Sequence, residues 1–347
     1  MSPSRNLAPG IIATLLPLAA AGPCDIYGSN GTPCVAAHST TRALFSSFSS
    51  PLYQVQRADG TTQDISPVSA GGVADGGAQD SFCAGTTCVI SAVSKMRYLP
   101  NIAIYDQSGN GNDLTRAPPG GAASGPADGG YDDLADATAA QVTLGGSTVY
   151  GVYVSPGIGY RNDKTTNIPT GDAAQGIYAV LDGTHYNGNC CFDYGNAEVN
   201  DLDNGNTHMQ ALYFGLGTTG GKGSGDGPWV MADLENGVFA GSDPGVVDSN
   251  PTANSRFVTG IVKGMPDYWE ILAGDATTGD LATGYAGVRP AGYETMTQEG
   301  AIILGIGGDN SNSAEGTFYE GVITAGFPSD DVDQQVQADI VAAGYSA

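Results

Sequence analysis

Basic residues are scarce in this sequence. Lys and Arg together number 12 of 347 residues, against 36 Asp and Glu, so the formal net charge is −24. Binding to nucleic acid or to an anionic membrane needs clustered positive charge, and neither is expected as a partner. Charged residues of all kinds make up only 14% of the chain. The acidity therefore reflects missing Lys and Arg more than abundant acid.

Long apolar runs are absent after the first 21 residues. No later segment reaches the roughly 18 unbroken apolar residues of a membrane span. The chain begins with a short basic stretch and a mostly apolar segment that ends in Ala19-Ala20-Ala21. This order predicts a signal peptide over 1–21 and a secreted, extracellular mature chain that starts at Gly22. A buried first helix is the alternative, and two prolines and a glycine within the segment weaken it.

Glycine is abundant, at 53 residues, but no Gly-X-Y period accompanies it, which excludes collagen. Short apolar runs bounded by Gly, Asp, Asn and Pro are typical of β-strands. These runs are Thr148–Val154, Gly176–Leu181, Gln210–Phe214, Trp229–Leu234, Phe257–Val262, Ala301–Ile306 and Thr317–Thr324. No linker separates two parts, so 22–347 is predicted to be one predominantly antiparallel β domain with long loops.

One helix is predicted at the end of the chain. Ser329 suits the N-cap, and Gly344 can end the helix. Three apolar residues between them repeat at a spacing of four, which gives the helix one buried face. These are Val332, Val336 and Ile340.

The six cysteines all lie in the predicted mature chain. Pairs Cys24–Cys34 and Cys83–Cys88 would each close a short loop, and Cys190 and Cys191 are adjacent with no obvious third partner. We therefore predict a vicinal disulfide. A zinc site is the alternative, but the chain has only three His and no Cys-x2-Cys spacing, so no metal or cofactor is expected. Asn30 begins the only glycosylation sequon without a middle Pro.

The predicted strand from Trp229 to Asn236 carries the first candidate chemistry. Alternation puts its apolar residues on one face and an aromatic ring with two carboxylates on the other. The apolar face is Val230, Ala232 and Leu234, and the other face is Trp229, Met231, Asp233 and Glu235. Carboxylates two residues apart lie about 7 Å apart on a strand. Such a row suits a sugar-binding cleft, but the pattern leaves open a solvated outer face, where acids are ordinary.

The second candidate is the loop Gly307-Gly308-Asp309-Asn310, which follows an apolar strand. Two glycines let the backbone approach a ligand closely, and Asp309 would lie at a strand end, where loops carry function. The alternative is an Asx turn, in which Asp309 bonds its own backbone. No GxSxG nucleophile elbow and no HExxH motif occur, and the GxGxxG match at 215–220 has no helix pattern after it.

Several long runs resemble the catalytic domain of fungal α-L-arabinofuranosidase B, glycoside hydrolase family 54. The runs are 22–27, 32–43, 105–112, 181–186, 190–198 (Cys-Cys-Phe-Asp-Tyr-Gly-Asn-Ala-Glu) and 299–312 (Glu-Gly-Ala-Ile-Ile-Leu-Gly-Ile-Gly-Gly-Asp-Asn-Ser-Asn). The resemblance covers nearly the whole predicted mature chain. It implies a concanavalin-like antiparallel β-sandwich of jelly-roll type. It also implies retaining, exo-acting release of L-arabinose from arabinose-containing plant cell-wall polysaccharides by a monomer.

The resemblance also implies roles for individual residues. Glu235, in the Asp-x-Glu-Asn motif, would be the nucleophile, and Asp309, in Gly-Gly-Asp-Asn, would be the acid/base. Asp233 would support the site. The vicinal pair and three further residues would line or contact the sugar: Cys190, Cys191, Trp229, Asn236 and Gly308. A lectin-like sandwich without turnover and a β-xylosidase on the same scaffold are the alternatives.

Two departures from the family are expected. Many members continue into a β-trefoil arabinose-binding module, which is absent from this sequence. The stretch 91–101 also reads as an insertion, and a retained intron is as good an explanation as a true loop. Peptide mass spectrometry across this stretch distinguishes the two explanations.

Overall fold

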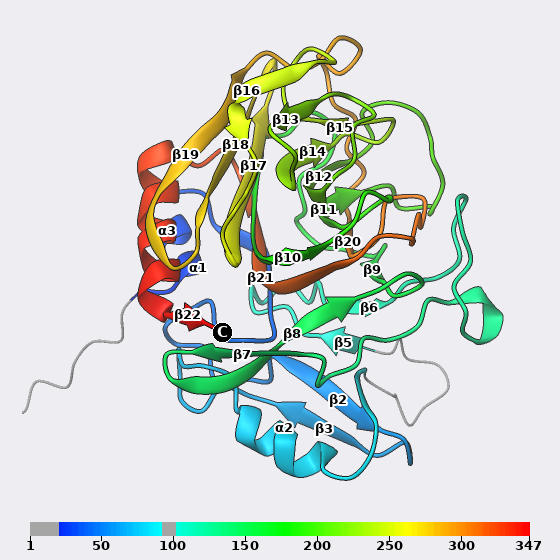
Figure 1. Ribbon diagram of the computed structural model, residues 1–347, viewed down its shortest axis with the longest axis vertical. Helices are drawn as coiled ribbons and strands as arrows, with labels where there is room; N and C mark the ends of the chain where they lie inside the picture. The colour runs from blue at the N-terminus through cyan, green and yellow to red at the C-terminus, as the bar shows by residue number, and fades with distance from the viewer. Residues whose placement is uncertain (1–20, 92–101) are drawn as a thin grey trace, which may run out of the picture.

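The computed structural model describes residues 21–91 and 102–347 (Figure 1). The predicted signal peptide at 1–21 and the predicted insertion at 91–101 lie almost wholly outside these residues. The described chain folds into two large, mainly antiparallel sheets with a C-terminal helix, which confirms the predicted β-sandwich. Within the described residues, no helix is long and apolar enough to cross a membrane.

The first sheet is built around β10 and β21, which pair along most of their length. Its strands, in spatial order, are β19 (Thr278–Gly287), β18 (Tyr268–Asp275), β17 (Phe257–Met265), β10 (Gln175–Tyr186), β21 (Gly316–Ala325), β8 (Ser147–Val154), β7 (Ala140–Leu144) and β22 (Tyr345–Ser346). Strand β1 (Cys34–Ser39) pairs with β21 beside this path.

The second sheet carries the candidate site. Its strands, in spatial order, are β15 (Val238–Phe239), β14 (Trp229–Asp233), β12 (Gln210–Gly215), β11 (Asp193–Ala197), β20 (Ala301–Leu304), β9 (Tyr160–Asn162), β6 (Leu114–Arg116), β5 (Ile102–Ile104), β2 (Tyr53–Arg57) and β3 (Thr62–Ile65). Strand β4 (Cys88–Ile90) pairs with β2. A short parallel ribbon of β13 (Lys222–Ser224) and β16 (Val246–Pro251) lies next to β14.

The two sheets pack face to face through β12 and β14 on one side and β10 and β17 on the other. Leu212, Val230 and Ala232 point into the shared core, as alternation along the strands requires. Gly260 on β17 faces Val230 and Leu212, and an added Cβ there would lie 3.0 Å from Val230. The missing side chain therefore sets how closely the two sheets approach.

The predicted C-terminal helix is confirmed as α3 (Asp330–Ala343), with Ser329 at the N-cap and a left-handed Gly344 at the C-cap. Its apolar residues are buried against β19 and α1. Lys263 of β17 is buried beneath it and binds Asp333 at 2.8 Å and Glu270 at 2.9 Å. This pairing satisfies a buried cation and attaches the helix to the first sheet.

Two short helices were not predicted. They are α1 (Pro23–Ser29) and α2 (Gly76–Cys83), and a 3₁₀ turn, η1, covers Asp128–Gly130. Disulfide Cys24–Cys34 ties α1 to β1, and Cys83–Cys88 ties α2 to β4. Helices of seven or eight residues are marginal alone. Their stability comes from these links and from packing, which a local pattern does not reveal.

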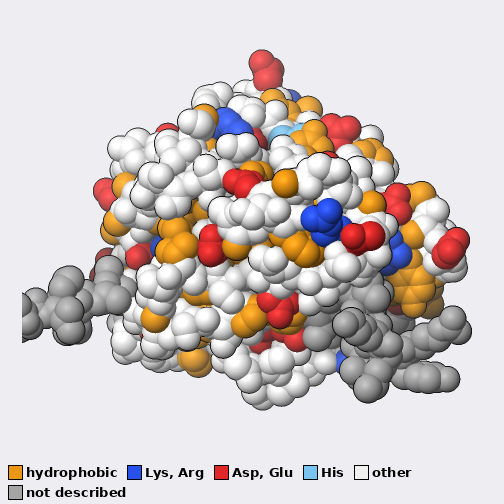
Figure 2. Space-filling model, turned by 90° about the horizontal axis from the view of Figure 1, so that it is seen from below, with side chains coloured by type: hydrophobic (Ala, Val, Ile, Leu, Met, Phe, Trp, Pro, Cys, Tyr) orange, Lys and Arg blue, Asp and Glu red, His pale blue; other side chains and the backbone are white. Residues whose placement is uncertain are grey.

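The surface agrees with the charge of the chain. Figure 2 shows acidic side chains scattered over one face, with few basic ones among them. Several of the few basic side chains are not on the surface. Arg42, Arg161 and Lys263 are buried and paired with carboxylates. A gathered basic surface of the kind that nucleic acid requires does not form on the face shown.

Candidate active site

The site lies on the outer face of β11, β12 and β14, opposite the shared core. Strand register places Asp193 beside Tyr213 and Met231 in one row, and Gly195 beside Ala211 and Asp233 in the next. All six are therefore on one face. Two apolar clusters occupy the same face on either side: Cys191, Tyr213, Trp229, Met231, Val238 and Ala240 in one, and Ala117, Ala197, Met209, Ala211, Ala301, Ile303 and Ile306 in the other.

Glu235 lies beyond the end of the strand, so the predicted alternation of side chains does not apply to it. Strand β14 ends at Asp233, and Glu235 has a left-handed backbone with φ 91°. Its N–H donates to Oδ1 of Asp233 at 2.9 Å. A positive φ costs a non-glycine residue about 1 kcal/mol or more, so the surroundings must hold it. The prediction that Glu235 continues the strand is wrong, because this turn redirects its side chain.

The Glu235 carboxylate is held by three N–H groups from the loop between β11 and β12. Oε1 accepts the backbone N–H of Asn204 at 2.6 Å. Oε2 accepts the backbone N–H of His208 at 3.1 Å and lies 2.9 Å from its Nδ1. Only 3% of the Glu235 side chain is exposed. Burial acts to lower the His208 pKa, but the bonds to the Gly205 carbonyl and to Glu235 raise it above its ordinary value. A protonated His208 forms an ion pair with the Glu235 carboxylate.

Asp309 follows β20 in the predicted glycine loop. Both the backbone N–H and the hydroxyl of Ser311 donate to Oδ1, at 3.1 and 2.6 Å. The Asx turn considered as an alternative therefore exists. Within the described residues, Oδ2 receives no hydrogen bond, so the turn orients the side chain and leaves one oxygen for other chemistry.

The vicinal disulfide joins these two parts of the site. Cys190 and Cys191 are bonded, with Cys190 exposed and Cys191 buried. Sγ of Cys191 lies 3.2 Å from Oδ2 of Asp233, and its N–H donates to the Ser311 carbonyl at 3.0 Å. The sulfurs and Asp233 lie close enough together to surround an ion. Disulfide sulfurs are not thiolates, however, so the group is a poor metal site.

Two buried acids beside the predicted residues were missed. Asp193 and Glu198 are each 1% exposed. Burial, with the charge of Asp233 adding to it, raises the pKa of Asp193 well above its ordinary value. Burial also raises the pKa of Asp233 to about 7 and that of Glu198 to about 9. A weak signal for Asp193 was its place between two aromatic residues of a buried strand, where an unpaired charge is costly.

Comparison with known proteins places the chain in a family. A family model described as "Alpha-L-arabinofuranosidase B, catalytic" matches residues 23–346. The chain belongs to this family of glycoside hydrolases.

Individual relatives agree with this assignment. The chain is 60% identical over 349 residues to an α-L-arabinofuranosidase of Hypocrea jecorina and 58% identical over 353 residues to α-L-arabinofuranosidase B of Emericella nidulans. Each match covers 100% of this chain and 67% of the relative. A solved arabinofuranosidase complexed with arabinofuranosyl-α-1,2-xylobiose matches with TM-score 0.89 and 58% identity, over 94% of this chain and 66% of that chain. The chain thus spans about two thirds of the length of these relatives.

Two of the residues that the resemblance assigned to the sugar site have unexpected surroundings. Trp229 was predicted to lie on the outer face of the strand and to line the sugar site, but only 3% of it is exposed. Its Nε1 donates to the Ser224 carbonyl at 2.9 Å, and its ring packs with Cys191 and Met231. A solvated outer face is equally excluded, because Met231 and Asp233 are buried too. Asn236 is exposed beside Glu235, and its amide donates to Asn206 at 3.2 Å.

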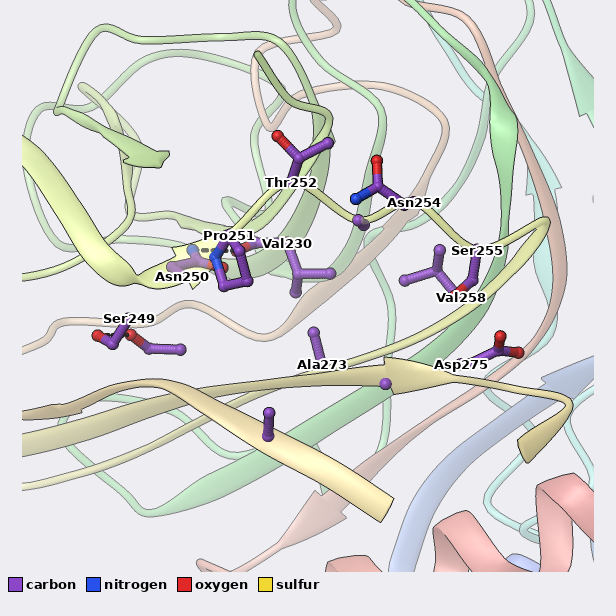
Figure 3. Close-up of a pocket in the computed structure, with 14 residues that line it drawn as sticks. Val230, Ser249, Asn250, Pro251, Thr252, Asn254, Ser255, Val258, Ala273 and Asp275 are labelled. Atoms are coloured by element: carbon purple, nitrogen blue, oxygen red, sulfur yellow. Dashed lines mark hydrogen bonds between the residues drawn. The ribbon is translucent and has the colours of Figure 1, made fainter. Parts of the chain in front are cut away.

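A separate cavity of about 260 Å³ lies at the rim between the two sheets (Figure 3). Its polar lining comes mainly from Ser249, Asn250, Thr252 and Asn254, with Asp275 from β18. None of the predicted catalytic residues lines it. One carboxylate without a partner carboxyl does not supply the pair that glycoside hydrolysis requires. The acid cluster over β14 therefore remains the candidate site of this family member.

Gly308 tests how tightly the cluster is packed. A Cβ added to Gly308 would overlap the Glu198 carboxylate. We expect Gly308→Ala to lower kcat/KM by at least roughly 10-fold, because overpacking costs about 1–3 kcal/mol and would displace either Glu198 or Asp309. Gly245→Ala is the matched control, since a Cβ there meets nothing within 4 Å. Equal activity of the two variants on an aryl glycoside would contradict this packing.

The buried acids predict a pH-dependent stability. Burial raises the pKa of Asp132 to about 6, besides the raised values of Asp233 and Glu198. Each group stabilises the fold fully below its ordinary pKa near 4 and loses that contribution as pH rises through its folded pKa. We expect the free energy of unfolding to fall from pH 5 to pH 8 at constant ionic strength, by about 1.4 kcal/mol per pH unit for each of these groups that is still protonated in the folded state. Urea denaturation at both pH values measures it, and a rise with pH would contradict it.

Proposed function

We propose that the chain is a secreted, retaining exo-α-L-arabinofuranosidase that releases terminal L-arabinofuranose from arabinoxylan, arabinan and related hemicelluloses. One observation carries the proposal: the buried Glu235 carboxylate is fixed by three N–H groups next to a second, half-buried carboxyl, Asp309. Membership of the arabinofuranosidase family supports the substrate class. Binding of arabinofuranosyl-xylobiose by a similar solved structure supports the exo mode.

In this mechanism Glu235 attacks the anomeric carbon of the arabinose. Its hydrogen bonds hold the carboxylate in one orientation, so little reorganisation is needed at the moment of attack. Asp309 donates a proton from Oδ2 to the leaving oxygen while Ser311 fixes Oδ1. Asp309 then removes a proton from the water that hydrolyses the glycosyl-enzyme. Retention requires the two carboxyls to be about 5–5.5 Å apart.

The remaining predicted residues surround these two. Asp233 supports the site because it holds the Glu235 backbone in its left-handed turn. The exposed Cys190 and the buried Cys191 form a rigid, polarisable edge against which a small furanose can pack. Asn236 and Gly308 contact the sugar in the proposal. In the proposal, the buried Trp229 does not contact the sugar and supports the vicinal disulfide by packing against Cys191.

Secretion is supported by three disulfides, which persist in oxidising compartments. The sequon residue Asn30 is exposed at the C-cap of α1, as a glycosylated asparagine must be. The chain is proposed to act as a monomer on plant cell-wall polysaccharide, without nucleic acid, membrane or cofactor.

The test is hydrolysis of 4-nitrophenyl α-L-arabinofuranoside beside 4-nitrophenyl β-D-xyloside, with the product anomer followed by proton NMR. The proposal expects faster turnover of the arabinofuranoside and α-arabinose as the first product. Faster turnover of the xyloside would favour a β-xylosidase, and a 60% identical relative from Trichoderma koningii is named arabinofuranosidase/β-xylosidase. A folded protein that binds arabinosylated glycans without turnover would favour the lectin-like alternative.

A further inference from the structure

Glu198 is the most unusual acid in the molecule outside the predicted catalytic set. It follows β11, is 1% exposed, and neither of its carboxyl oxygens receives a hydrogen bond within the described residues. An ionised carboxylate buried without donors costs several kcal/mol. A protonated carboxyl instead carries a donor of its own and needs only an acceptor.

The Glu235 carboxylate is the neighbouring acceptor, because its charge and a side-chain hydrogen bond with it are among the causes that raise the pKa of Glu198. On its other side, Glu198 touches the Cα of Gly308, the residue before Asp309. Glu198 therefore lies beside Glu235 and against the residue that precedes Asp309. Its low exposure keeps it away from the substrate, so any role it has acts through Glu235.

The nearest cation does not serve the Glu198 carboxyl. Arg161 of β9 donates to the backbone carbonyls of Glu198 and Gly308 and pairs with Asp163 and Asp201. The other charged groups around Glu198 are acidic or lie beyond Glu235. They are Asp193 of β11, Asp309 after β20, Glu299, which accepts the N–H of Val199, and His208, which binds the far side of Glu235.

We propose that Glu198 is a positioning residue that stays protonated and donates its carboxyl proton in a hydrogen bond to Glu235. The inference rests on the proposed function, in which Glu235 is the nucleophile. The bond adds a fourth donor to that carboxylate. It holds the attacking oxygen in place and stabilises the negative charge that returns to Glu235 when the glycosyl-enzyme is hydrolysed.

The titration of Glu198 agrees with this geometry. Burial raises its pKa to about 9, the negative charge of Glu235 adds to the rise, and its own backbone N–H and Arg161 oppose it. Two carboxyls in contact cannot both ionise cheaply, so one keeps a proton. Glu235 has three donors, whereas the Glu198 oxygens receive no hydrogen bond from another residue that the structure describes, so the shared proton stays on Glu198.

The test compares Glu198→Gln, which keeps a donor, with Glu198→Leu, which removes it. At pH 5 we expect the Gln variant to keep kcat within about threefold. The Leu variant should lose about 10- to 100-fold in kcat, with little change in KM, as for one hydrogen bond to a charged group. The acidic limb of the kcat/KM profile should move to higher pH in Leu and stay in place in Gln. Glu294→Gln, at an exposed acid, is the control.

Other results overturn the proposal. If Glu198 were ionised, both variants would remove a negative charge and move the acidic limb to lower pH. If it were merely structural, both would lower the melting temperature without moving the limb. Infrared spectroscopy gives a reading without turnover: the band of one protonated carboxyl at pH 7 should disappear in Glu198→Gln and persist in Glu294→Gln. If the band is unchanged in Glu198→Gln, the proposal is overturned. If the wild type does not hydrolyse arabinofuranosides but the band is lost in Glu198→Gln, only the proposed function is overturned.

Discussion

Replacing Glu235 by glutamine is expected to lower kcat/KM for 4-nitrophenyl α-L-arabinofuranoside by roughly 10⁴-fold or more, the range seen when an essential catalytic group is removed. The amide cannot form the glycosyl-enzyme, whereas the shape of the side chain is kept. Binding should survive, because Gln retains an oxygen for the Asn204 or His208 N–H. The measurement is steady-state hydrolysis together with calorimetric binding of the unreacted substrate.

A second variant separates a nucleophile from a residue that is merely important. In Glu235→Gly, azide can enter the space of the carboxylate and attack the anomeric carbon directly. The glycosyl azide formed should then have inverted configuration, since only one displacement occurs. Glu294→Gln should behave as wild type. Wild-type turnover by Glu235→Gln, or a retained azide product from Glu235→Gly, would remove Glu235 from its proposed role.

Much of the fold follows from local pattern. Each predicted strand coincides with an observed one, because apolar runs of this length between Gly, Asn, Asp and Pro have no other way to bury their surface. Helix α3 begins and ends where its cap residues predicted. Helices α1 and α2 escaped prediction because their stability is tertiary: a disulfide anchors each to a strand, and neither has a repeating apolar face.

The site was less predictable than the fold. Alternation correctly separated Val230 and Ala232 from Met231 and Asp233, but it failed at Glu235. The Asp233 side chain holds that backbone turn, and N–H groups 27 and 31 positions earlier in the chain hold the redirected carboxylate. No pattern within one strand records such contacts. The burial of the outer face was also missed, because it depends on the loops that close over β14.

The partnerships among the acids are the least visible from sequence. The roles of Asp193 and Glu198 cannot be inferred before the sheet order is known. In the sheet, β11 lies two strands from β14, which brings both acids beside Asp233 and Glu235. Four buried or nearly buried carboxyls and Asp309 then share one small region. Burial and mutual repulsion raise the pKa of Asp193, Glu198 and Asp233, and protons on these groups limit the negative charge around Glu235. The protonation of the site is therefore a property of the fold.

Asp309→Asn is expected to have the second largest effect, and its size should depend on the leaving group. An arabinoxylan oligosaccharide leaves as a basic alkoxide and needs the proton, so its kcat/KM should fall by roughly 10³- to 10⁴-fold. Nitrophenolate leaves without full protonation, so the loss on the aryl substrate should be smaller, about 10- to 100-fold. The Asx turn survives, because Asn keeps an Oδ1 for Ser311.

The dependence on leaving group distinguishes an acid/base from a structural residue. A residue that only shapes the loop would lower both substrates by the same factor, and Ser311→Ala supplies that comparison, since it loosens Asp309 without removing the carboxyl. In Asp309→Gly, azide should restore turnover of the aryl substrate by attacking the glycosyl-enzyme, which gives an azide of retained configuration. Opposite configurations from the Glu235 and Asp309 variants would assign the two carboxyls to the two displacements. Equal losses on both substrates, without azide rescue, would mean that another group protonates the leaving oxygen. Asp233, with a pKa of about 7, would then be the first residue to substitute.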